Sequence, residues 1–164
     1  MSTHDLTQSE FGWQQDDEGV YIIWAASQLA RRTDSKLTLD FYLGGLYVVT
    51  FNRLLPYFRK PEAVAKFAAK EYGITFPIWW YWAGLLQALT SGEVPGMHKS
   101  TPEVHELLTD AARSAALQNR KINVIDVLIA IKNSKSEACR KFIESGIDVD
   151  RLLADSVDYR SAGG

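Results

Sequence analysis

Apolar residues follow a helical pattern most clearly in the second half of the chain. They recur at spacings of three and four residues, which places them on one face of a helix: Val104, Leu107, Leu108, Ala111, Ala112 and Ala115. A hydroxyl residue, Thr101, comes directly before Pro102 and Glu103, an order typical of a helix start. We therefore expect a helix from this point to about Asn119.

Three more helices are expected after it. Asn123 is suited to capping a helix over residues 124–132, with Asp126 in its first turn. Ser134 and Glu137 have the spacing of a capping box, which predicts a third helix that ends at Gly146. A short fourth helix should begin at Asp148 and end near Leu153, followed by a flexible tail over residues 156–164.

The first half repeats this order of signals. An apolar helix ends near Thr33, and Thr38 is placed to cap a second helix with Asp40 in its first turn. Pro61 opens a third helix that ends at Gly73. A fourth helix is expected from Pro77 to Gly92.

The two halves can be aligned. Residues 36–46 match residues 121–131 at an offset of 85, whereas Gly73 matches Gly146 at an offset of 73. The first half therefore carries an insertion at about 47–60. We predict one all-α domain over 1–164, a pseudo-twofold bundle of two tandem four-helix repeats at about 16–90 and 101–155, joined by a linker at about 91–100.

Composition and charge exclude several functions. The formal net charge is −2, so no basic excess indicates binding to nucleic acid. The longest apolar stretch, about 76–89, is shorter than the roughly 20 residues that cross a membrane. The single cysteine cannot form an internal disulfide, and together with a polar N-terminus it is compatible with a cytoplasmic protein.

The second half resembles a Clp repeat, which occurs in pairs in the N-terminal domains of Clp-type AAA+ unfoldases. The resemblance is carried by residues 101–103, by Leu107-Leu108 and Ala111-Ala112, by residues 122–131, by Ala138 and by residues 146–152. Residues 31–46 and 71–74 suggest a degenerate first copy. The resemblance implies an all-α bundle that binds other proteins and recruits substrates or adaptors. Since no ATPase module follows, we expect a free-standing module or an excised domain.

The resemblance also points to individual residues. Some family members that recognise phosphorylated arginine use an acidic residue at the start of the second helix of each repeat. Asp40 lies in that place in the first copy, but Ile125 lies in the matching place in the second copy. An isoleucine side chain cannot accept a hydrogen bond from a guanidinium group.

Aromatic residues supply further candidates for protein binding. Trp79, Trp80, Tyr81 and Trp82 are consecutive, and successive helical positions point about 100° apart, so they cannot all face one core. They are expected either to pack between the halves or under the insertion, or to form an interface. The insertion is either a partner-binding protrusion or a longer second helix capped by Pro56.

The favoured hypothesis is a non-catalytic module that binds a Clp-type ATPase, its substrate or its adaptor. Binding would use the aromatic helix, the insertion and the groove between the repeats, with these candidate residues: Asp40, Phe41, Tyr57, Phe58, Arg59, Trp79, Trp80 and Trp82. Alternatives are a dedicated inhibitor or immunity-type protein that blocks one partner, the N-terminal piece of a secretion-system unfoldase, and a small enzyme. No nucleophile–base pair, metal-ligand set or cofactor motif is evident, so no catalytic residue, metal or cofactor is predicted.

Overall fold

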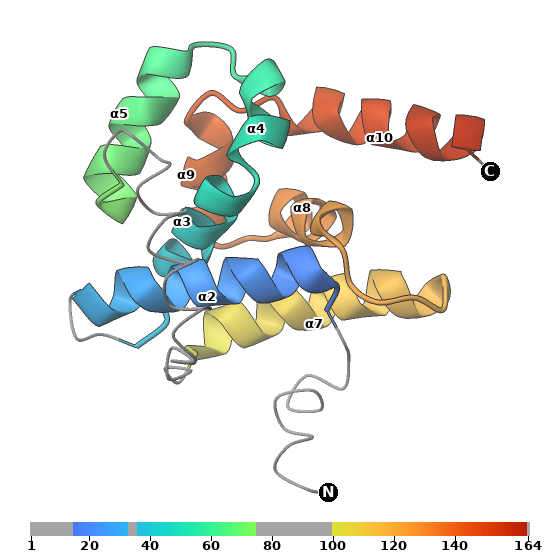
Figure 1. Cartoon of the computed structure of the whole chain (residues 1–164), viewed down its shortest axis with the longest axis horizontal. Coiled ribbons are helices and arrows are strands. Elements are labelled where there is room, and N and C mark those ends of the chain that lie inside the picture. Colours follow the sequence, from blue (N-terminus) through green and yellow to red (C-terminus); the bar gives the residue numbers. More distant parts are fainter. Residues whose placement is uncertain (1–14, 33–35, 75–99, 164) are drawn as a thin grey trace, which may run out of the picture.

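The computed structural model describes residues 15–32, 36–74 and 100–163, and this part of the chain is built from helices (Figure 1). They are α2 (Asp17–Arg32), α3 (Leu39–Val49), α4 (Phe51–Leu54), the 3₁₀ turn η1 (Leu55–Tyr57), α5 (Pro61–Tyr72), α7 (Pro102–Leu117), α8 (Val124–Asn133), α9 (Glu137–Glu144) and α10 (Val149–Gly163). Isolated β-bridges occur, but the described ranges contain no strand. The prediction of an all-α fold is confirmed for them.

Several helix ends lie where their capping residues predict. Thr38 caps α3 by accepting a hydrogen bond from the N–H of Phe41 at 3.3 Å. Asn123 caps α8 in the same way, through the N–H of Asp126 at 3.1 Å. Gly73 ends α5 with φ of +68°, a left-handed conformation that glycine adopts without strain.

Two helices in the second half differ from the sequence prediction. Residue 136 caps α9, and the expected capping box at Ser134 is wrong, because the Ser134 hydroxyl accepts a hydrogen bond from the N–H of Ser136 instead. The last helix, α10, continues to Gly163 and so runs beyond its predicted end near Leu153. No glycine or proline interrupts the chain between those two residues.

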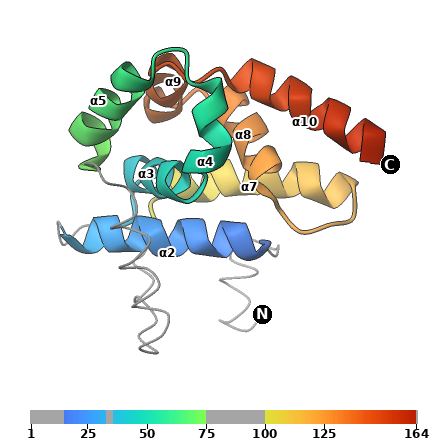
Figure 2. The ribbon, with the colours of Figure 1, turned by 45° about the horizontal axis from the view of Figure 1, so that its top comes forward.

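Helix α3 lies at the centre of the first half and contacts α2, α5, α7 and α9. Its side chains Tyr42, Leu43 and Leu46 are completely buried. Figure 2 shows α2 as an outer layer, with α3, α7 and α8 across the middle and α5, α9 and α10 beyond them. The apolar side chains of the described helices form one cluster that extends through both halves. Its continuity favours a single domain.

The predicted insertion is folded against this core. Tyr47 belongs to α3 and is buried, and the helix ends where Thr50 caps it. The chain then forms α4, whose Leu54 is fully buried, and η1, which contains Pro56. The segment is therefore broken into short helical pieces by Thr50 and Pro56, since proline cannot continue the hydrogen bonding of a helix interior.

The two halves exchange backbone contacts just before their helices begin. Gln15, before α2, pairs with Ile122 of the second half, and Ser100, before α7, pairs with Leu37 of the first half. The N–H of Asp16 donates to the carbonyl of Ile122 at 3.0 Å, and the N–H of Thr101 donates to the carbonyl of Leu37 at 3.1 Å. Each half thus supplies the backbone partner for the segment before the first described helix of the other half.

The expected helix from Pro77 to Gly92, and nearly all of the expected linker, lie outside the described residues. Over the described residues, no helix combines the length and apolarity that crossing a membrane requires.

Candidate functional site

A groove of about 740 Å³ lies beside Asp40, between the start of α3, one face of α7 and the connection from α8 to α9. Five carboxylates and two lysines line it together with smaller polar and apolar side chains; the charged residues are Asp40, Glu103, Glu106, Asp110, Glu137, Lys135 and Lys141. We call this region the acidic groove. Its charge makes it complementary to a cationic ligand.

The helices explain how these carboxylates come together. Asp40, Glu103 and Glu137 each lie in the first turn of a helix, in α3, α7 and α9 respectively. Acidic residues are favourable there because the N-terminal end of a helix carries a partial positive charge. Glu106 and Asp110 follow Glu103 at helical spacing on α7, so they extend the same acidic face.

The environment of Asp40 raises the pKa of its carboxyl above the usual value. Partial burial is the main cause, and the negative charges of Glu71, Glu103 and Glu137 act in the same direction, whereas Lys141 opposes them. Burial and nearby negative charges both disfavour the charged form of a carboxyl group. A cation placed in the groove would relieve this repulsion.

Phe41 is a candidate next to Asp40 in the sequence, and Ile125 occupies the place in the second half that matches Asp40. Both residues lie against the core. Each is partly buried and packs against the apolar cluster. Phe41 therefore contributes to the packing around α3, while Asp40 at the preceding position lines the groove.

Three other candidates, Tyr57, Phe58 and Arg59, lie together at the end of the insertion. The ring of Phe58 stacks on Tyr47 with centroids 6.2 Å apart and meets Phe51 edge-on at 5.8 Å. Phe58 is thus held in an aromatic cluster within the first half.

Tyr57 and Arg59 contact the start of α10 and the residues before it. The N–H of Asp148 donates to the Tyr57 carbonyl at 2.8 Å, and the N–H of Arg59 donates to the Gly146 carbonyl at 2.7 Å. The Tyr57 hydroxyl donates to Asp155 at 2.7 Å, and this hydrogen bond, together with slight burial and the charge of Asp155, raises the pKa of Tyr57.

Arginine side chains add to this contact, which we call the clasp: residues 56–59 against residues 146–155. The guanidinium of Arg151 lies 5.0 Å from the centre of the Tyr57 ring and donates to the Pro56 carbonyl at 3.0 Å. Arg59 lies 3.6 Å from Asp148. The clasp joins the halves, so these candidates make contacts within the chain.

Trp79, Trp80 and Trp82 lie outside the described residues. The sequence candidates are therefore distributed over the acidic groove, the core, the clasp and this segment. Among the candidates that the structure describes, Asp40 lines the acidic groove.

The other acidic residues of the groove are not among the candidates predicted from the sequence. Glu103, Glu106 and Asp110 are three and seven positions apart, which places them on one face of a helix. A solvated helix face has the same spacing. Only the position of α3 and α9 beside α7 shows that these residues line a groove and not an ordinary solvated face.

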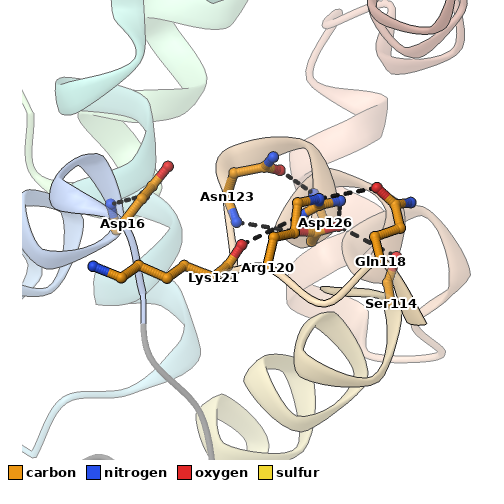
Figure 3. Close-up of polar contacts among 8 residues, drawn as sticks. Asp16, Ser114, Gln118, Arg120, Lys121, Asn123 and Asp126 are labelled. Atoms are coloured by element: carbon orange, nitrogen blue, oxygen red, sulfur yellow. Dashed lines mark hydrogen bonds and ion pairs between the residues drawn. The ribbon is translucent and has the colours of Figure 1, made fainter. Parts of the chain in front are cut away.

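An ion pair between the buried Asp126 and the partly exposed Arg120 stabilises the turn between α7 and α8 (Figure 3). The side chain of Asp126 is 1% exposed. It accepts hydrogen bonds from both Nη groups of Arg120, and the distance from Arg120 Nη2 to Asp126 Oδ1 is 2.7 Å. It also accepts the N–H of Asn123 at 2.9 Å and the Ser114 hydroxyl at 3.3 Å. Burial raises the pKa of Asp126, but these hydrogen bonds and the charge of Arg120 outweigh it and lower the pKa below its usual value.

All the hydrogen bonds that Asp126 accepts come from its own half, as Figure 3 shows, with Asp16 at the edge of the same region. Asp126 also forms a capping box with Asn123 at the start of α8. This arrangement stabilises the turn and leaves the carboxylate without room for a ligand.

Among the described residues, no three His, Cys, Asp or Glu side chains are grouped as a metal site would require. Cys139 is buried, and burial is the main cause that raises the pKa of its thiol. A thiol in this state is a poor nucleophile.

Comparisons with known proteins add no family to this picture. No protein-family model matches the chain, and searches of curated proteins and of solved structures gave no significant match.

Proposed function

We propose that this chain is a non-catalytic protein-binding module made of two tandem helical repeats, similar to the repeats of Clp-type unfoldases. The observation that carries the proposal is the exchange of backbone hydrogen bonds between the halves. Asp16 donates to Ile122, and Thr101 donates to Leu37. Asp16 and Thr101 are 85 positions apart, and so are Leu37 and Ile122. The two hydrogen bonds therefore join matching positions, but the donor lies in the first half in one bond and in the second half in the other. A pseudo-twofold axis between the halves requires this exchange.

The helix bounds support the same relation. The offset of 85 carries α2 (Asp17–Arg32) onto α7 (Pro102–Leu117), and it carries the cap Thr38 onto the cap Asn123. The glycines that follow α5 and α9, Gly73 and Gly146, both have positive φ. Two copies of one helical unit would account for all of these features together.

The acidic groove is the surface that we propose for the partner. Five carboxylates against two lysines favour a segment rich in lysine or arginine. Partial burial and the neighbouring carboxylates raise the pKa of Asp40, and a bound cation would favour its charged form. In the cytoplasm, the module would present such a segment to a Clp-type ATPase, or would hold the ATPase, its substrate or its adaptor through it.

Binding of peptides tests the groove directly. We expect a fluorescent Lys/Arg-rich peptide to bind the full chain, as measured by anisotropy at low salt. Replacing Glu103 and Glu106 together by glutamine should weaken binding by about 10-fold, since each exposed charge pair contributes up to about 1 kcal/mol. The double variant Glu62→Gln/Glu144→Gln changes the net charge equally outside the groove and should bind like the wild type.

Equal loss of affinity in both double variants would attribute binding to overall charge and would contradict the groove. The identity of the partner is tested by affinity capture with the same three proteins as baits. A Clp-type ATPase, or its substrates, retained by the wild type and by the control but not by the groove variant would support the proposal. A single unrelated protein retained stoichiometrically would instead favour a dedicated inhibitor that uses the same fold.

A further inference from the structure

We draw no further inference here: the strongest candidate, the hollow of about 510 Å³ that Arg59, Lys60 and Lys66 line at the start of α5, rests on a helix N-terminus and exposed cations, and no second observation in the described part of the chain indicates a ligand for it.

Discussion

Asp126 and Asp40 are acidic residues in the first turns of α8 and α3, yet their surroundings shift their pKa values in opposite directions. Arg120 and two other donors compensate the charge of Asp126, so the carboxylate is stable although it is buried. Asp40 is more exposed, but its partial burial and then the negative charges of neighbouring carboxylates raise its pKa. The charged form of Asp126 therefore stabilises the fold, whereas the charged form of Asp40 destabilises it and is accessible to a ligand.

Replacing Asp126 by alanine should lower the free energy of unfolding by about 3 kcal/mol at pH 7, because Arg120 and the N–H of Asn123 lose their acceptor. The folded pKa of Asp126 is lowered, so its contribution is complete above the unfolded pKa of about 4 and is lost as the pH falls through the folded pKa. Urea unfolding at several pH values measures both effects. The variant Glu144→Gln removes an exposed pair with Arg140 and should change the stability by less than about 0.5 kcal/mol; a similar loss in both would contradict this account.

Replacing Asp40 by asparagine should leave the protein as stable as the wild type or slightly more stable at pH 7, by no more than about 0.5 kcal/mol. The folded pKa of Asp40 is raised, so its charged form opposes folding once the pH exceeds the unfolded pKa. The advantage of the variant should therefore disappear as the pH falls to about 4, where Asp40 becomes protonated. A clear loss of stability at pH 7, measured by thermal unfolding, would show that the helix N-terminus outweighs the neighbouring carboxylates.

At the scale of elements, the close approach of α2 and α3 depends on Gly45. A Cβ atom at this position would lie 2.6 Å from the Ile22 carbonyl oxygen and 2.7 Å from the Ala26 nitrogen, both of which are backbone atoms. Ala130 lies at the matching place on α8, an offset of 85 away, so the second half accommodates a methyl group where the first does not. Glycine is unfavourable inside a helix, so the pair Gly44-Gly45 in α3 indicates that another helix packs closely against it.

We expect Gly45→Ala to lower the free energy of unfolding by about 1–3 kcal/mol, because α2 must move away and the overpacking exceeds the gain of about 1 kcal/mol in helix propensity. Gly44→Ala should cost less, since the atom nearest to its Cβ is the end of the flexible Leu29 side chain, at 2.9 Å. Chemical denaturation followed by circular dichroism would compare the two. Equal stability of Gly45→Ala and the wild type would contradict the close contact.

The sequence predicted those elements whose signals are local. The cap Thr38, the cap Asn123 and the terminal Gly73 act within a few residues, and the helices begin and end there. The capping box predicted at Ser134 did not form, because the Ser134 hydroxyl accepts a hydrogen bond from the N–H of Ser136, and α9 begins after Ser136.

Features that join distant elements could not be predicted. The acidic groove needs α3, α7 and α9 side by side, and the clasp joins Tyr57 to Asp155 across 98 positions. Arg120 is six residues from Asp126, across a turn, which is not a helical spacing. Asp40 is a candidate from the sequence because it lies in the place that the resemblance indicates, whereas Glu106 and Asp110 belong to an ordinary exposed helix face.

At the scale of the whole molecule, backbone hydrogen bonds run between the two halves in both directions. Each supplies a backbone acceptor to the other, and the clasp adds a third connection between residues 56–59 and 146–155. Helix α10 contacts both α8 of its own half and η1 of the other half. Since neither half keeps all of its backbone partners without the other, we expect them to unfold together.

The chain contains separate probes for the two halves. All five tryptophans precede residue 83, whereas the single cysteine, Cys139, is buried in α9 of the second half. Tryptophan fluorescence and the reactivity of the Cys139 thiol should therefore change at the same urea concentration, because one cooperative transition unfolds both halves. Labelling with a thiol reagent after equilibration at each urea concentration measures the second probe, and Cys139→Ala is the control for background labelling.

If the contacts between the halves cause the cooperativity, weakening them should make the fluorescence transition and the Cys139 transition occur at different urea concentrations. Ile122 is 1% exposed and lies where Gln15 pairs with the second half. Ile122→Ala should lower both transition midpoints, as the loss of a buried side chain costs about 2–5 kcal/mol, and the midpoint of Cys139 exposure should fall further than that of fluorescence. A wild-type protein in which Cys139 becomes reactive well before the fluorescence changes would mean that the second half unfolds independently, and the exchanged backbone hydrogen bonds would then not couple the two halves.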